Sequence, residues 1–353
     1  MFNTIESITD GTLLLELLNG RRVAALSEAR LERLLDLAGR HGLTALINEA
    51  LAAQGVASDA WRDVCADLEL NSRVQLKAAA ELSQALDAAN VSAVVAKGVA
   101  LALSVYANPG LRPFIDIDVL IAPESLKRAD GVLRGLGYAL DRKSVRNPIE
   151  CSYTREKLPG FPVSIDLHWS YTGGDGLQAP ARIPIGEILE RARVLSGVRM
   201  PADEDNILLA AGNMPRKAAQ PFMLVVDFAK LARLAVDWNL VRERAVRWHV
   251  RTGLWIGFEL ARAHLNAPID PVFLNRIEPP RLRRNWLLNA LRGELLWDSE
   301  KHTRAKYSIA FKLMCLDSNL DELRALCALP RGVLRKLKLS RTLAEVELEG
   351  VKG

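Results

Sequence analysis

The stretch VSAVVAKGVALALSVYANPGLRPFIDIDVLIA, residues 91–122, decides the predicted fold, because the hydrophobic periodicity of the chain changes there. VSAVVA (91–96) is short, apolar and β-branched, which favours a strand, whereas ALALSVY (100–106) favours a helix. ANPGLRP (107–113) contains two prolines and a glycine and predicts a turn. FIDIDVLIA (114–122) then predicts a second strand. We therefore expect α/β structure to begin here.

Two acids on this second strand form the first candidate site. Asp116 and Asp118 are two positions apart, so their side chains project from one face, while Ile115, Ile117 and Val119 point to the other. The two carboxylates lie about 6.5 Å apart along the strand and repel each other unless a cation sits between them. Mg²⁺ (or Mn²⁺) suits such oxygen ligands. A solvated strand edge is the alternative, but the apolar surroundings favour a central strand and a metal site.

A third β-rich stretch, PVSIDLHWSY (162–171), follows a predicted amphipathic helix over 124–136. Its alternation places Asp166 and His168 on a polar face. If this strand pairs beside the first acidic strand, Asp166 completes a three-carboxylate cluster that can hold two metals, or serves as general base. A carboxylate hydrogen-bonded at a sheet edge is the alternative for Asp166. A single histidine in such a position is more often packed and hydrogen-bonded than a ligand, so we expect the former for His168.

The segment VVAKG (94–98) is a candidate phosphate site, because it ends a strand just before a helix, where free backbone N–H groups favour an anion. Lys97 adds a positive charge, and Gly98 allows close approach of a ligand. Arg112, presented by the turn, either binds a phosphate or is solvated. A simple turn glycine is the alternative for Gly98.

Helical periodicity flanks this region on both sides. We expect an N-terminal helical subdomain over 1–90, an α/β core over 91–184 and a C-terminal helical subdomain over 185–353. The β structure is expected to be confined to about 91–171. The two sets of helices are predicted to form walls around the acidic cluster and to leave a cleft for a ligand.

Composition bounds the function classes. The chain has 353 residues, of which 49% are hydrophobic and 25% charged, as in folded globular proteins. Its net charge of +5 is too mild to identify a nucleic-acid partner. The four cysteines form no C-x-x-C pair, which argues against zinc and disulfide scaffolds. The apolar runs are shorter than the ~20 residues of a membrane span, and the acidic N-terminus predicts a cytoplasmic protein.

AKGVALALSVYANPGLRPFIDIDVLIAPESLKRADGVLRGLGY (96–138), followed by IDLHWSY (165–171), resembles the uncharacterised nucleotidyltransferase family of the DNA polymerase β-like superfamily. The shared pattern is K-G-x-x-L…Y-x-x-P-x-x-R-x-x-x-D-x-D and then D-L-H-W. The resemblance implies an α+β fold with a small mixed β-sheet nucleotidyltransferase core between N-terminal and C-terminal helical subdomains. It implies that Asp116 and Asp118 are metal ligands, that Asp166 is the third acid and that Gly98 lies in the nucleotide-binding turn.

The implied reaction is Mg²⁺- or Mn²⁺-dependent transfer of a nucleoside monophosphate from an NTP to a hydroxyl or phosphate, with pyrophosphate leaving. The acceptor stays open between a small molecule, a peptide and RNA. The chain departs from the superfamily in two places. Val99 follows Gly98 where Ser or a second Gly is usual, and LLAAGNMPRKAAQPF (208–222) stands where relatives often place histidines.

Two alternative functions remain open. One is a non-catalytic scaffold or binding protein that retains the fold, against which the three intact acids count. The other is an RNA-acting nucleotidyltransferase toxin, suggested by the basic runs RLRRNW (281–286) and RKLKLSR (335–341). A solvated helix face is the simpler interpretation of those runs.

Overall fold

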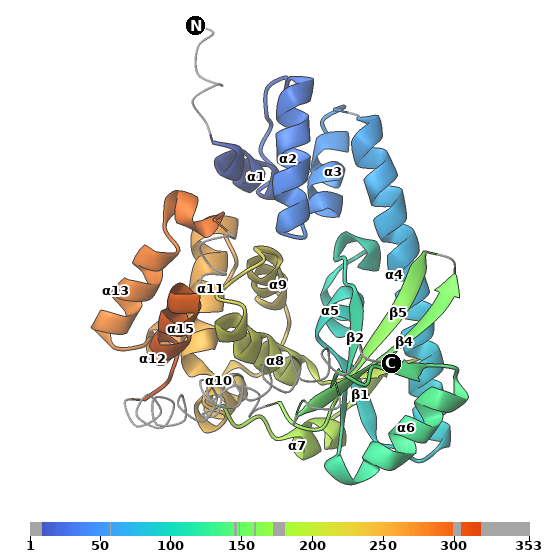
Figure 1. Cartoon of the computed structure of the whole chain (residues 1–353). Helices are drawn as coiled ribbons and strands as arrows, with labels where there is room; N and C mark the ends of the chain where they lie inside the picture. The colour runs from blue at the N-terminus through green and yellow to red at the C-terminus, as the bar shows by residue number, and fades with distance from the viewer. Residues whose placement is uncertain are drawn as a thin grey trace, which may run out of the picture.

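Helices at both ends of the chain surround a small mixed sheet (Figure 1). The computed structural model describes residues 9–56, 58–144, 147, 149–158, 160–171, 181–298 and 305–318. The predicted α+β class, with a mixed sheet between flanking helices, is confirmed. The subdomain boundaries after residues 90 and 184 stay predictions.

The N-terminal helices end in one long helix that leads to the sheet. The four helices are α1 (Asp10–Leu18), α2 (Glu28–Arg40), α3 (Thr44–Ala52) and α4 (Asp59–Ala88). The hydroxyl of Thr9 caps α1 by accepting a hydrogen bond from the amide of Thr12 at 3.2 Å. Helix α4 ends just before Asn90, whose φ of 53° lies in the left-handed region that stops helices.

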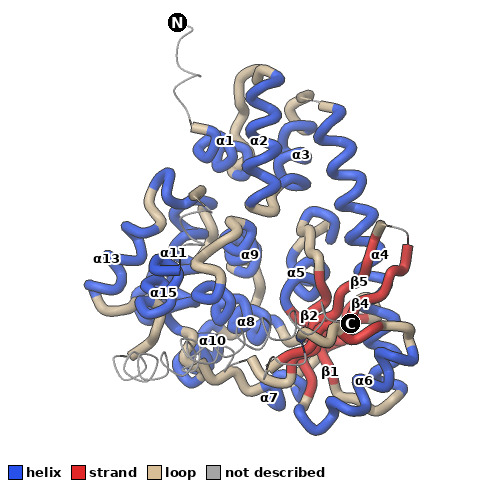
Figure 2. The backbone as a smooth tube through the Cα atoms, in the orientation of Figure 1, coloured by secondary structure: helices blue, strands red, loops and turns tan. Residues whose placement is uncertain are grey.

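The sheet has five strands in the order β1-β2-β5-β4-β3. Figure 2 draws strands in red and shows them gathered on one side of the helices. Their bounds are β1 (Ala93–Ala96), β2 (Asp116–Ile121), β3 (Ala139–Leu140), β4 (Glu150–Leu158) and β5 (Phe161–His168). Strands β2 and β5 pair in parallel, and the other neighbours are antiparallel. The expected pairing of the two acidic strands is therefore confirmed.

Short helical elements connect the first strands. They are α5 (Lys97–Val105), η1 (Pro109–Leu111), η2 (Pro123–Ser125) and α6 (Leu126–Gly135). The side chain of Asn108 caps η1 by accepting a hydrogen bond from the amide of Gly110 at 3.0 Å. The predicted turn between the first helix and the acidic strand thus folds into a single 3-10 turn.

The two faces of the sheet differ in chemistry. Ile117 and Val119 of β2 and Ile165 of β5 are fully buried in a core shared with α4 and α6. Ile115 does not join them as expected: it is 81% exposed, because the strand begins only at Asp116. Helix α4 therefore covers the apolar face, which differs from the expectation that the helices before residue 90 together form a wall around the acids.

The described residues after 184 are mostly helical, and their helices lie beside α5 and the sheet (Figure 1). These helices are α7 (Ile185–Glu190), α8 (Asp203–Arg216), α9 (Met223–Leu231), α10 (Trp238–Arg247), α11 (Arg251–Leu265), α12 (Pro271–Ile277), α13 (Arg281–Ala290), η4 (Gly293–Leu296) and α15 (Ala305–Met314). Helices α8 and α9 pack against α5 and enclose a second core. No helix in the described ranges is long and apolar enough to cross a membrane.

A short hairpin corrects the expected limit of the β structure. β6 (Arg193–Leu195) and β7 (Val198–Met200) form a two-stranded sheet beyond residue 171. Three residues per strand are too few to show an alternation in sequence. β7 packs beside β1 and α4, with Met200 fully buried.

Candidate functional site

Three acids from two paired strands meet on one face of the sheet. Asp118 of β2 lies directly opposite Asp166 of β5, because the parallel register pairs these two positions. One oxygen of each carboxylate and one ring nitrogen of His168 lie within 4.8 Å of one another. The charges of Asp118 and Asp166 also act on Asp116, two positions earlier on β2. The predicted residues Asp116, Asp118 and Asp166 thus face one shared space.

Lys97 lies against the carboxylate of Asp118. Its Nζ donates to Oδ1 of Asp118 at 2.5 Å and lies 5.6 Å from the centre of the Tyr171 ring. Its backbone has φ of 50°, a left-handed conformation that residues other than glycine adopt rarely. Such strain persists where the surroundings over-determine it and is common at functional sites. The strained backbone therefore aims an ammonium at the central carboxylate.

His168 is held by carboxylates at both ring nitrogens. Nε2 lies 2.8 Å from Oδ1 of Asp118, and Nδ1 lies 2.9 Å from Oε2 of Glu150. Burial lowers the pKa of His168, but the hydrogen bonds to Asp118 and Glu150 outweigh it, and the pKa is raised. The contacts at both ring nitrogens fix the orientation of His168 and let it hold Asp118 in place, and His168 also belongs to the cluster with Asp118 and Asp166 that could hold a metal ion.

The neighbouring acids Asp116 and Asp118 have opposite electrostatics. Burial, followed by the charges of Asp118 and Asp166, raises the pKa of Asp116 to about 6. Burial also acts to raise the pKa of Asp118, but the charge of Lys97 and the hydrogen bond from His168 overcome it and hold that pKa well below its usual range. Asp118 is therefore a fixed anion, whereas Asp116 carries an unfavourable charge until a cation joins it.

The acids fit a hard divalent cation. Among the residues that the structure describes, the contacts of Lys97 and His168 both fall on Oδ1 of Asp118, which leaves Oδ2 for a metal. Oδ1 of Asp166 accepts a hydrogen bond from Ser152 Oγ at 2.6 Å, which orients that carboxylate. A set of carboxylate oxygens on a half-buried face is the donor chemistry of Mg²⁺ and Mn²⁺.

Gly98 and Arg112 lie side by side at the edge of the site. A Cβ atom on Gly98 would come within 2.8 Å of the Phe114 Cβ and 3.3 Å of Arg112 Nη1, so close packing alone requires glycine there. Arg112 is only 8% exposed, and its Nε and Nη2 donate to Asp227. The predicted binding of a phosphate by Gly98 and Arg112 stays a prediction.

A profile of the uncharacterised nucleotidyltransferase family matches residues 27–266, about two thirds of the chain. The chain belongs to this family. The match spans the whole five-stranded sheet together with helices α8 and α9, so it includes every residue of the site named above. Membership indicates the nucleotidyltransferase kind of protein. No curated protein matches the chain.

Some site residues of this family member carry no strong signal in the sequence. Glu150 and Ser152 lie on β4, whose sequence ECSYTREKL is dominated by polar residues and does not suggest a central strand. Arg216 ends α8 and acts electrostatically on Lys97, Glu150 and Tyr171. The end of that helix thus places a cation near Lys97 and Glu150.

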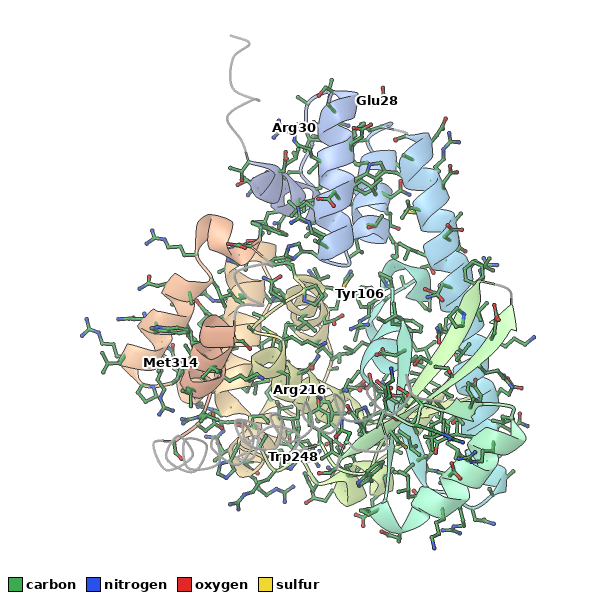
Figure 3. The ribbon with its side chains drawn as sticks, viewed as in Figure 1. Glu28, Arg30, Tyr106, Arg216, Trp248 and Met314 are labelled. Carbon is green, nitrogen blue, oxygen red and sulfur yellow. The ribbon has the colours of Figure 1, made fainter. Side chains whose placement is uncertain are left out.

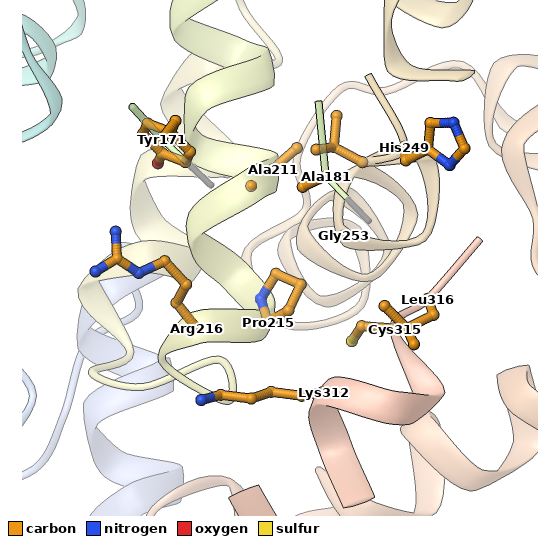
Figure 4. A pocket seen from close by; sticks show the side chains of 12 residues that line it. Tyr171, Ala181, Ala211, Pro215, Arg216, His249, Gly253, Lys312, Cys315 and Leu316 are labelled. Atoms are coloured by element: carbon orange, nitrogen blue, oxygen red, sulfur yellow. The ribbon is translucent and has the colours of Figure 1, made fainter. Parts of the chain in front are cut away.

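A narrow pocket adjoins Arg216 between α8, α11 and α15. Figure 4 shows Arg216 and Lys312 extending toward the side of this pocket where Tyr171 lies, with His249 at the other side. Since the Tyr171 ring also contacts Lys97, this pocket borders the acidic site. It is lined mainly by apolar groups from Ala211, Gly212, Pro215, Val250 and Leu316.

Proposed function

We propose that this protein is a metal-dependent nucleotidyltransferase that moves a nucleoside monophosphate from an NTP to an acceptor. The observation that carries the proposal is the pairing of Asp118 with Asp166 on parallel strands, with Asp116 on the same face and Lys97 against them. Family membership supports the same class of reaction.

Asp116, Asp118 and Asp166 would hold Mg²⁺ or Mn²⁺, which supplies charge neutralisation and Lewis acidity to the phosphates when bound. Before that, Lys97 and His168 keep Asp118 ionised and in place. Asp116 supplies the additional negative charge that makes the site attract a second positive group. Asp118 is thus already ionised before the metal binds, whereas the charge of Asp116 becomes favourable only when a cation is bound.

The remaining residues position the reactants. Lys97 and the backbone at Gly98, at the start of α5, bind phosphate oxygens, and Arg216 with Lys217 adds positive charge from α8. An acceptor hydroxyl attacks the α-phosphorus, the bond from this phosphorus to the β-bridging oxygen breaks, and pyrophosphate leaves. Asp166 takes the proton of the hydroxyl as general base.

The alternatives have weaker support from the same structure. A scaffold that had lost activity would have no need of a left-handed Lys97 aimed at an ionised Asp118. In the basic run over 281–286, Arg283 is buried, with its Nη1 donating to the carbonyl of Leu316, and Arg284 pairs with Glu278. The run over 335–341 lies outside the described residues.

Transfer of label from NTP tests the proposal. The protein is incubated with Mg²⁺ and each NTP, labelled at either the α- or the γ-phosphate, together with fractionated small molecules, peptides or RNA. We expect label from the α-phosphate to enter one acceptor fraction and label from the γ-phosphate to appear in pyrophosphate. Release of γ-phosphate as inorganic phosphate without α-label transfer would indicate an NTP hydrolase and contradict the proposal.

Lys97→Met should weaken binding of an NTP in the presence of Mn²⁺ by about 10- to 150-fold, because one charge-assisted phosphate contact contributes roughly 1.5–3 kcal/mol. Binding of Mn²⁺ alone should be kept or strengthened, since the variant removes the cation that competes for Asp118. Calorimetric titrations with Mn²⁺ and then with NTP measure both. Unchanged NTP affinity would show that Lys97 serves only to balance Asp118.

A further inference from the structure

Two buried side chains of one segment, Tyr106 and Arg112, meet at the carboxylate of Asp227, which lies more than a hundred positions further along the chain. Asp227 of α9 accepts hydrogen bonds from Arg112 Nε and Nη2, each at 2.8 Å, and from the Tyr106 hydroxyl at 2.8 Å. Asp227 is 1% exposed, Tyr106 5% and Arg112 8%. We call these three residues the Arg112 clamp. Figure 3 shows Tyr106 at the junction of α5 with the helices of both ends of the chain.

The clamp ties down both ends of one connection. Tyr106 follows the last residue of α5, and Arg112 follows η1, so a single carboxylate holds the segment between them from each side. Burial and the charge of Asp227 raise the pKa of Tyr106, so its hydroxyl stays a donor. A bidentate guanidinium–carboxylate pair fixes direction as well as distance.

The clamped segment also touches the candidate site at two points. Arg112 Nη1 and Phe114 pack against Gly98, next to the strained Lys97. Asp116 begins β2 two residues after Phe114. Asn71 of α4 donates to the Phe114 carbonyl at 3.1 Å and so holds the same segment from the opposite side. A shift of this segment would therefore move both the turn at Gly98 and the carboxylate of Asp116.

We infer that Arg112 is a positioning residue, which acts through Asp227 and Tyr106 to hold residues 106–116 against α9 and thereby places Gly98 and Asp116 for metal and nucleotide. The identity of what the site binds rests on the proposed function; the clamping itself does not. In this assignment the arginine and tyrosine of the shared K-G…Y…R…D-x-D pattern form the support of the site, and Asp227 is their anchor.

Asp227→Asn tests the clamp, because it keeps the shape of the anchor and removes its charge. Hydrogen–deuterium exchange of the metal-free protein should show amides in 106–116 exchanging at least tenfold faster than in wild type. Binding of Mn²⁺ alone, followed by its electron paramagnetic resonance signal, should weaken about fivefold. Asp205→Asn is the matched control, since Asp205 is fully buried and pairs at 3.0 Å with Arg191 and Arg244. That control should leave the exchange of 106–116 unchanged.

The competing role for Arg112 gives the opposite result. If Arg112 were a phosphate ligand, Asp227→Asn would free its guanidinium, tighten NTP binding and leave Mn²⁺ binding unchanged, which would overturn the inference. If Asp227→Asn does not fold, Tyr106→Phe removes one hydroxyl only, and exchange of 106–116 should rise two- to fivefold; no rise would overturn the inference. Wild-type protein that binds no Mn²⁺ would contradict the proposed function, while the exchange experiment would still decide the clamp.

Discussion

Asp118→Asn is expected to lose metal binding and to destabilise the protein. Asp118 is 7% exposed and balances Lys97 at 2.5 Å and His168 at 2.8 Å. Removing its charge leaves the buried ammonium of Lys97 without its carboxylate partner, which costs about 3–5 kcal/mol of unfolding free energy. Loss of a direct ligand should weaken Mn²⁺ binding by about 100-fold or more, since supporting residues alone contribute 10- to 100-fold. Chemical denaturation and Mn²⁺ titration measure the two effects.

A second substitution separates folding from binding in this test. Lys97→Met combined with Asp118→Asn removes a buried cation together with its anion, so much of the lost stability should return while Mn²⁺ binding stays absent. Asp36→Asn is the surface control: its carboxylate is 70% exposed and pairs with Arg40, so at most about 0.5 kcal/mol should be lost. Wild-type Mn²⁺ affinity in Asp118→Asn would show that the carboxylate is purely structural.

Asp116→Asn should have the opposite effect on stability. The pKa of Asp116 is raised from 3.8 to about 6 by burial and by the charges of Asp118 and Asp166. At pH 7.5 the metal-free protein therefore carries an unfavourable charge, and its removal should stabilise the fold by about 1–3 kcal/mol. Binding of Mn²⁺ should weaken at the same time. Loss of stability at pH 7.5 would instead mean that Asp116 has a favourable structural partner.

The pH dependence of stability in wild type and in Asp116→Asn tests whether the pKa of Asp116 is raised. Because the folded pKa of Asp116 exceeds the unfolded one, the folded state binds the extra proton between pH 4 and pH 6. Metal-free wild type should therefore gain stability as the pH falls from 7.5 to 5, and Asp116→Asn should gain less. The raised pKa of His168 acts in the same direction in both proteins, so the difference between them isolates Asp116. Saturating Mg²⁺ should reduce this difference.

The positions of the acids followed from the sequence because they depend on local rules. Asp116 and Asp118 share a face since side chains alternate along a strand, and this spacing is visible in the sequence. Asp166 required one further assumption, that its strand pairs beside the first, and the parallel register of β2 with β5 satisfies it. The alternation of side chains along each strand, together with the pairing of β2 with β5, is enough to bring the three carboxylates to one place.

The residues that position the acids and set their pKa values could not be recognised from the sequence around them. Asp227 lies more than a hundred positions from Arg112, and no spacing rule joins a turn arginine to an aspartate in an apolar helix. Arg216 reaches the site only because α8 packs against α5, the helix that begins at Lys97. The left-handed backbone of Lys97 is likewise a result of tertiary contacts, since sequence gives lysine no preference for it.

Thermal denaturation with NTP tests the central claim, that these acids form a divalent metal and nucleotide site. Each NTP at millimolar concentration is added to wild type with Mn²⁺, with Mg²⁺ and with neither cation. The account predicts that one or more NTPs raise the melting temperature by about 2–5 °C only when a cation is present, with a smaller rise from the cation alone, since bare carboxylates repel a triphosphate. An equal rise without any cation, or no rise with any NTP, would contradict it.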